Sequence, residues 1–350
     1  MKLRSPLRRF IGLTIALTAG CEHTAPFRPE DGGAVGPLNP GSIAQLTFSR
    51  GQDVIPAWLP DGSGLVFTAE RRDRADHDRC LAFMPAAGGA ITRYGCRTVA
   101  ADDSINVFDE AAIHGDSIAY VRAGTERFLQ GIGPDRQELV IAPITDPNAA
   151  RVLQQLGFTT PWGETYDAIS HLVWLGPGRL AFIGEHVTYP RGCSSCAPDT
   201  VRVGIGLVIA DVAGSALALT RMPDGDSASS LAASVNGDSV YFTKNGDTHL
   251  FRRTLSAGQT DTLLDFAVGV VRDITVSSGR LAAVVGGIVG TPTSPDEGGA
   301  LFLVAGAATA RIGDPDLLYR RPALSPDGAR LVVSARDSVS STNLWLFQLP

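Results

Sequence analysis

The chain has 350 residues, of which 44% are hydrophobic, 7% aromatic and 19% charged, with 39 glycines and 22 prolines. This composition suits many short strands joined by turns, and it argues against a coiled coil or a disordered chain. The 30 Lys+Arg are outnumbered by 36 Asp+Glu, so the surface field disfavours nucleic acid and anionic headgroups as partners.

The first twenty residues have the pattern of an export signal, in which basic residues precede a short apolar run from Phe10 to Ala19. The next residues, Ala19-Gly20-Cys21, resemble a bacterial lipobox, in which Cys21 is lipidated and becomes the mature N-terminus. Thr18 departs from the leucine preferred there, and an ordinary secretory signal cleaved nearby is the alternative. Glu22 after the cysteine resembles the outer-membrane type of lipoprotein rather than the type retained at the inner membrane.

The predicted organisation is a lipoprotein signal peptide over residues 1–20 and a flexible tether over 21–41. The tether is rich in proline and glycine and has no apolar pattern from which to build a core. Removing the four basic residues of the signal leaves 26 Lys+Arg against 36 Asp+Glu, a net charge of −10. The predicted location is the bacterial cell envelope, with the protein lipid-anchored in the outer membrane and facing the periplasm or the cell surface.

Two stretches at opposite ends of the chain share one pattern, a strand, a Pro-Asp-Gly turn and a buried strand. The turns are Pro60-Asp61-Gly62 and Pro326-Asp327-Gly328. Proline presets the backbone for a turn, aspartate bonds its own backbone, and glycine accepts a positive φ. Weaker copies with a glycine-containing turn between two strands bring the count to six, centred on residues 55–67, 112–121, 171–182, 234–242, 274–284 and 321–333. Their spacing is that of propeller blades.

Each unit except the last is followed by two more strand patterns, ending near residues 94, 153, 220, 264 and 312. The last unit has a third strand, Leu344 to Phe347, and no fourth. An unpaired strand pattern, Ile43 to Phe48, precedes the first unit, and we expect it to complete the last blade and close the ring. The predicted fold is therefore all-β, a six-bladed β-propeller of four-stranded antiparallel blades over residues 42–350.

The Pro-Asp-Gly repeat, the Gln45-Leu46-Thr47 strand and the six-blade count resemble the WD-like repeat of the TolB-type β-propeller over residues 42–350. Some TolB-like propellers are sugar lyases that bind metal through histidines, and this resemblance implies the enzymatic alternative.

Long connections between second and third strands fall on one face of the predicted ring, at about residues 70–79, 122–137, 184–202 and 287–299. Insertions gathered on one face of a repeat protein often form its binding face, although they also drift wherever the core tolerates them. We call this the long-loop face. The predicted function is a monomeric, non-catalytic module that binds a protein, peptide or glycan there and meets the membrane through its anchor only.

Four cysteines remain after Cys21, and the oxidising compartment favours disulfides. Cys80 and Cys96 flank a predicted two-residue turn at Gly88-Gly89, which would place position 80 opposite 97 and beside 96. Cys193 and Cys196 form a Cys-X-X-Cys in the third long loop. A local disulfide is favoured there over a metal or redox site, because no second closely spaced pair and no helix start are present.

The histidines are scattered, and no His-Glu-X-X-His or Gly-X-Ser-X-Gly motif occurs. His77 lies in a charged loop and His114 in a turn, so structural roles are favoured. His186 beside Glu185 is a weak metal candidate. We therefore expect no catalytic residues, no metal and no cofactor. The alternative is a metal-assisted polysaccharide lyase or hydrolase with its site on the long-loop face.

Overall fold

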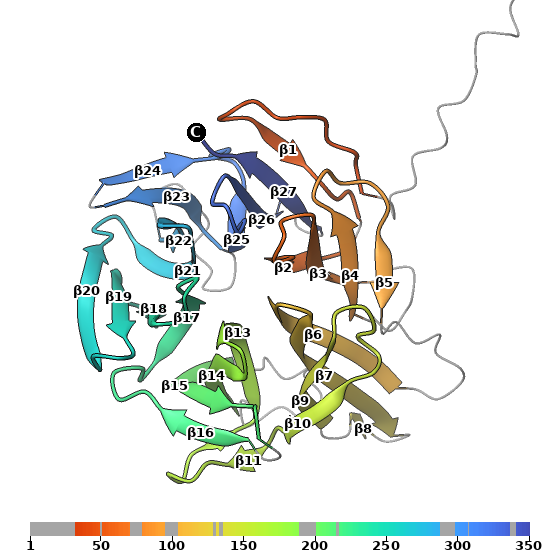
Figure 1. Ribbon diagram of the computed structural model, residues 1–350, viewed down its shortest axis with the longest axis vertical. Helices are drawn as coiled ribbons and strands as arrows, with labels where there is room; N and C mark the ends of the chain where they lie inside the picture. The colour runs from red at the N-terminus through yellow and green to blue at the C-terminus, as the bar shows by residue number, and fades with distance from the viewer. Residues whose placement is uncertain are drawn as a thin grey trace, which may run out of the picture.

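The computed structural model describes residues 32–49, 51–70, 79–94, 104–128, 131–132, 136–188, 201–214, 217–287, 298–306, 308–336 and 341–350. It confirms the predicted all-β, six-bladed propeller. Six blades stand around a central axis, each with its first strand innermost (Figure 1). Among these residues no helix has the length and apolar character needed to cross a membrane.

The strands follow the predicted order within each blade. The innermost strands of blades one to six are β2 (Asp53–Trp58), β6 (Ser104–His114), β13 (Ala168–Gly176), β17 (Ala228–Ala233), β21 (Val270–Ser277) and β25 (Leu318–Leu324). The second strands are β3 (Gly64–Glu70), β7 (Ser117–Phe128), β14 (Arg179–Thr188), β18 (Ser239–Lys244), β22 (Arg280–Gly286) and β26 (Arg330–Arg336). The third strands are β4 (Arg79–Pro85), β9 (Arg136–Pro143), β15 (Val201–Asp211), β19 (His249–Thr254), β23 (Ala300–Ala305) and β27 (Thr342–Gln348).

The outer strands of blades one to five are β5 (Thr92–Tyr94), β10 (Arg151–Gln155), β16 (Ala218–Arg221), β20 (Gln259–Asp265) and β24 (Ala308–Ile312). Three short strands were not predicted. They are β8 (Gly131–Ile132), which pairs with β7, and the hairpin of β11 (Phe158–Thr159) and β12 (Thr165–Tyr166) between blades two and three. One parallel pair, Arg79 with Val107, joins the sheets of blades one and two.

The N-terminal strand closes the ring as predicted. β1 (Ile43–Gln45) is the outer strand of blade six and runs antiparallel to β27, with Ile43 opposite Phe347 (Figure 1). Beyond β1 the pairing continues, because the Leu46 amide donates to the Leu344 carbonyl at 2.8 Å. The Leu344 amide in turn donates to the Thr47 hydroxyl at 2.9 Å. Every blade thus has four strands.

The end of the predicted tether packs on the propeller, which moves the start of the packed chain to about residue 33. The Gly33 amide donates to the Leu46 carbonyl at 2.8 Å, and the Val35 amide donates to the Ala87 carbonyl at 2.7 Å. Val35 and Leu38 contact the core between blades one and six.

Next to this segment, the turn between the third and fourth strands of blade one differs from the predicted turn. The pairing of β4 with β5 places Leu81 opposite Tyr94, two positions away from the register that a tight turn at Gly88-Gly89 would give. The connection bends earlier, where the Gly88 amide donates to the Pro85 carbonyl at 2.9 Å, and it then lies against the segment from Gly33 to Val35.

The core lies between blades rather than inside one sheet. The described residues form six buried apolar clusters, and each combines side chains from two neighbouring blades. Between blades one and six, for example, Leu46, Phe67 and Leu344 are fully buried together. Each blade therefore depends on both neighbours for its burial, as expected for a closed repeat fold.

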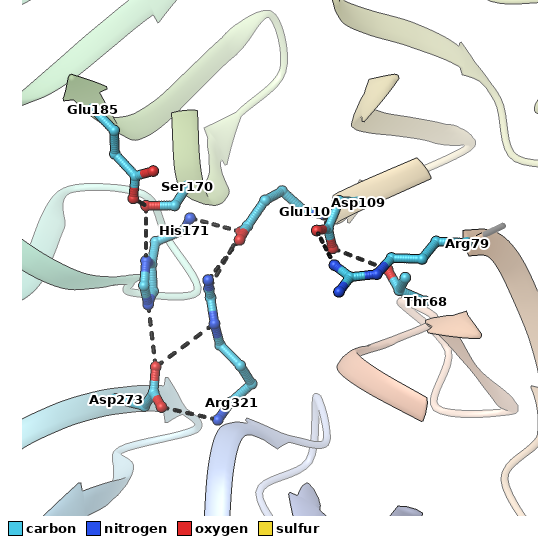
Figure 2. Close-up of polar contacts among 9 residues, drawn as sticks. All are labelled: Thr68, Arg79, Asp109, Glu110, Ser170, His171, Glu185, Asp273 and Arg321. Carbon is cyan, nitrogen blue, oxygen red and sulfur yellow. Dashed lines mark hydrogen bonds and ion pairs between the residues drawn. The ribbon is translucent and has the colours of Figure 1, made fainter. Parts of the chain in front are cut away.

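All six innermost strands are interrupted at the same height. In β2, β6, β13 and β25 two residues oppose one residue of the next strand, and the first of the two has a positive φ. These four residues are Ile55, Glu110, His171 and Arg321, with φ between 48° and 54°. In β17 and β21 the pairing skips one residue at this height. Such bulges re-aim side chains, and those of β6, β13 and β25 turn Glu110, His171 and Arg321 toward the axis (Figure 2).

Candidate functional site

A polar pocket of about 560 Å³ opens on the long-loop face. Its wall includes Arg79 at the start of β4, Glu185 near the end of β14 and Gly298 before β23, which are residues bordering the long loops. Most of three of these loops lies outside the described residues, whereas the predicted loop at 122–137 is described except for 129–130 and 133–135 and is largely strand. Four arginines and four acidic residues line the pocket, namely Arg79, Arg272, Arg320, Arg321, Asp109, Glu110, Glu185 and Asp273. Their formal charges cancel, so the pocket suits a polar ligand rather than a strongly charged one.

The floor of the pocket is a buried ionic network made by three bulges and a neighbouring strand (Figure 2). The Arg321 guanidinium donates to both oxygens of Glu110, at 2.5 and 3.2 Å. The Arg321 backbone amide donates to Asp273 at 3.1 Å. His171 links the same partners, since its backbone amide donates to Glu110 at 2.6 Å and its Nε2 lies 3.2 Å from Asp273. Blades two, three, five and six thus meet at one point on the axis.

Burial and charge set the protonation of this floor. Burial opposes ionisation of Asp273, but the hydrogen bond to His171 and the Arg321 guanidinium outweigh it and lower the pKa of the carboxyl. Burial and the Arg321 guanidinium lower the pKa of His171. Burial opposes the charge of Arg321, yet Glu110 and Asp273 prevail and raise the pKa of its guanidinium. Both carboxylates therefore already contact one fixed cation.

Two clusters of polar side chains, one on blade three and one on blades one and two, extend the floor into the wall (Figure 2). The Ser170 hydroxyl donates to Glu185 and lies 3.2 Å from His171 Nδ1. On the other side, Arg79 and Asp109 form an ion pair at 3.4 Å, and the Thr68 hydroxyl donates to Asp109 at 3.2 Å.

Two buried oxygens in the pocket wall are without a hydrogen-bond partner within the described part of the chain. They are Glu185 Oε2 and the hydroxyl of Ser334, a residue with 0% exposure. Leaving a buried oxygen unpaired costs about 1–3 kcal/mol, so these atoms mark where a ligand or an ordered water would bind.

A second, smaller cavity of about 330 Å³ occupies the other half of the axis, on the face of the Pro-Asp-Gly turns. It shares the ionic floor but is otherwise mostly apolar, with Trp58 and Trp174 in its wall. Both indoles are held in place, donating to the Ala323 carbonyl at 2.9 Å and the Ala112 carbonyl at 3.1 Å. The floor therefore separates a polar half from an apolar half.

The predicted cysteine sites are only partly described. Cys80 is fully buried in β4, opposite Ala69. Cys21, Cys96, Cys193 and Cys196 lie outside the described residues, as does His77. Lipidation and both disulfides therefore stay predictions.

The predicted metal candidates do not assemble with the floor. His186 pairs with Asp167 at 2.6 Å and is half exposed. His114 stacks on Trp174, with ring centroids 5.7 Å apart, which fits the structural role predicted for it. Over the ranges that the structure describes, no group of three or more His, Cys, Asp or Glu side chains is arranged to hold a metal ion.

The residues of the floor were not predicted from the sequence, although the sequence contains a signal for them. Glu110, Asp273 and Arg321 are charged residues within innermost strands, a few positions before each repeat turn. A charge at an inner-strand position is costly unless it is paired, so its recurrence in three repeats indicates a shared site.

No protein-family model matches the sequence, and no curated protein sequence matches it either. Solved structures do align. A gluconolactonase from Xanthomonas campestris aligns over 90% of this chain and 98% of its own, with 15% identity and a TM-score of 0.51. A calcium-binding protein, regucalcin, from Agrobacterium tumefaciens aligns over 85% and 90%, with 14% identity and a TM-score of 0.50. These likenesses are of fold alone.

Structures of TolB proteins are also among the matches. TolB from Acinetobacter baumannii aligns over 81% of this chain and 63% of its own, with 13% identity and a TM-score of 0.47.

Proposed function

We propose that this protein is an envelope-associated, non-catalytic propeller that binds a polar peptide or glycan segment in the pocket of the long-loop face. The observation that supports this most is the pocket itself, which has a volume of about 560 Å³, equal numbers of basic and acidic side chains in its wall, and two buried oxygens with no hydrogen-bond partner among the described residues. A mixed set of fixed donors and acceptors is how a protein orients a neutral or zwitterionic ligand.

The buried ionic floor favours binding over metal-assisted chemistry. A divalent cation at Glu110 or Asp273 would have to displace the Arg321 guanidinium, which contacts both carboxylates. The floor is thus a preorganised surface in which Arg321 already pairs with both carboxylates.

Binding is tested with a soluble protein lacking residues 1–31, screened against glycan and peptide arrays. Hits are then measured by calorimetry with Arg320→Ala, an exposed arginine of the pocket wall, and with Val235→Ser as the control. Val235 is 75% exposed and lines the cavity on the opposite face. We expect Arg320→Ala to weaken binding by about tenfold, as one charged contact provides. Loss of binding in Val235→Ser alone would place the ligand on the wrong face.

We also propose that Cys21 anchors the protein in the outer membrane. The support is the Ala19-Gly20-Cys21 sequence after an apolar run. We expect Cys21→Ala to leave the membrane fraction or to remain unprocessed, as measured by fractionation and gel mobility. Unchanged partition and mobility would rule out lipidation at this residue.

A further inference from the structure

Four side chains in the pocket floor and wall, two of them buried and two partly buried, are connected in series, Glu185, Ser170, His171 and Asp273 (Figure 2). Ser170 Oγ is hydrogen-bonded to Glu185 Oε1 and lies 3.2 Å from His171 Nδ1. His171 Nε2 lies 3.2 Å from Asp273 Oδ1. Ser170 and Asp273 are each 5% exposed, and the His171 side chain is 11% exposed. The series is therefore mostly shielded from bulk water.

The protons available to this series can be counted. Three contacts need three protons, one between each pair of heavy atoms. A serine hydroxyl provides one proton and a neutral imidazole provides one. If Glu185 and Asp273 are both carboxylates, one contact brings two lone pairs together, which is costly in a buried site.

We propose that the series holds a third proton, which Glu185 and His171 share through Ser170. In one arrangement Glu185 is a neutral acid that donates from Oε1 to Ser170, Ser170 donates to His171 Nδ1, and His171 donates from Nε2 to Asp273. In the other, His171 is an imidazolium that donates to Ser170 and Asp273, and Ser170 donates to carboxylate Glu185. Glu185 gives its proton to Ser170 Oγ while Ser170 gives its own to Nδ1, so atoms and total charge are conserved.

The surrounding charges favour the additional proton. Glu110 and Asp273 together carry two negative charges and Arg321 carries one positive charge. With Glu185 ionised and His171 neutral, the buried set has a charge of −2, and the third proton reduces this to −1. Around Glu185, the other charged groups are the Asp167–His186 pair beside it on blade three. The same pocket is also lined by Arg79, Asp109, Arg272 and Arg320.

The location of this proton decides what the pocket offers a ligand. Glu185 lines the pocket, and its buried Oε2 lacks a partner among the described residues. When Glu185 is the carboxylate, Oε2 accepts a hydrogen bond from a hydroxyl or an ammonium group. A ligand that bears such a donor therefore moves the proton to His171. The proton is held with the pocket empty, so this inference does not depend on the proposed function.

The test counts the protons directly by NMR at pH 7 on the unliganded protein. Histidine labelled with ¹⁵N reports both ring nitrogens of His171, and glutamate labelled with ¹³C at the carboxyl reports Glu185. His171→Gln and Glu185→Gln assign the signals. We expect the protonated fraction of Glu185 and the doubly protonated fraction of His171 to sum to one. A fully ionised Glu185 beside a singly protonated His171 would overturn the proposal.

Two variants separate proton sharing from mere proximity. Ser170→Ala removes the atom through which the proton passes, and we expect the third proton to be lost at pH 7. Ser170→Thr keeps the hydroxyl and should restore the wild-type signals. Glu138, which pairs with Arg122 in blade two, is the control carboxyl and should be unchanged by either variant. Identical Glu185 and His171 signals in wild type and Ser170→Ala would also overturn the proposal. The wild-type count remains decisive if a variant fails to fold.

Discussion

Replacing Arg321 with methionine should destabilise the propeller severely, although methionine keeps an unbranched apolar side chain at this position. The guanidinium is the cation for two carboxylates whose side chains, on Glu110 and Asp273, are each 8% exposed. Its side chain is 19% exposed, so water does not replace it. Removing one partner of a buried ion pair costs about 3–5 kcal/mol, because the remaining charge is left uncompensated.

The design of a double-mutant cycle follows from the same contacts. Glu110→Gln keeps the size of the side chain and an oxygen to accept from the His171 amide, but it removes the charge. We expect it to cost about 1.5–3 kcal/mol, the range for hydrogen bonds to charged groups. The double variant should cost less than the sum by about 0.5–3 kcal/mol, because much of the penalty in Arg321→Met comes from isolated Glu110.

Urea unfolding followed by circular dichroism gives the free energy of unfolding of each variant. The control is Arg252→Met, which breaks a half-exposed pair with Asp261 at 3.2 Å. An exposed pair contributes about 0–1 kcal/mol, so this variant should remain close to wild type. Arg321→Met destabilising no more than Arg252→Met, or additive effects of the two changes of the cycle, would refute the role of Arg321 as the buried partner of Glu110.

Three further predictions concern the ring, its acid sensitivity and its cysteines. Leu46→Ala, at a fully buried position of the closing segment, should cost about 2–5 kcal/mol in urea unfolding, whereas Ile43→Ala, at 39% exposure, should cost less than about 1 kcal/mol; equal costs would contradict the closure. The pKa of folded Asp273 is lowered, so its ionisation stabilises the fold above its unfolded pKa of about 3.9 and this contribution is lost as pH falls below that value. Thermal melts of Asp273→Asn should therefore lose less stability between about pH 5 and pH 2 than wild type, and parallel profiles would be the contrary result. Peptide mapping without reduction should link Cys80 to Cys96, a bridge contributing on the order of 3 kcal/mol, and a link from Cys80 to another cysteine would disprove the pairing.

The strands and turns could be predicted because their causes are local. Asp61 Oδ1 accepts from the Ser63 amide at 2.9 Å, and Asp327 Oδ1 accepts from the Ala329 amide at 3.0 Å. Gly62 and Gly328 each have a φ of 70°. These are the roles expected for aspartate and glycine in such turns. The closing strand could be found by counting, since the last blade lacked one strand.

The site could not be predicted in the same way. Its members come from four blades, and Glu110 and Arg321 are 211 positions apart. The bulges that aim them at the axis break the alternation by which strand faces are assigned. The predicted register of β4 with β5 was wrong for a related reason. Segment 33–41 has the composition of a linker, and only the assembled ring shows that Val35 and Leu38 have a surface to cover.

The closing strand also has a consequence for the order of assembly. Thr47 and Leu344 are hydrogen-bonded across 297 positions, so β1 leaves the ribosome long before its partner β27 exists. Until β27 is made, β1 has no ladder to join, and blade six cannot be completed by any neighbouring segment of the chain. Until then the edge of β26 is uncovered, and an incomplete ring offers that edge to other molecules. Folding of the whole propeller accordingly waits for the final strand, and a nascent chain stalled before residue 342 has five complete blades but no closed ring.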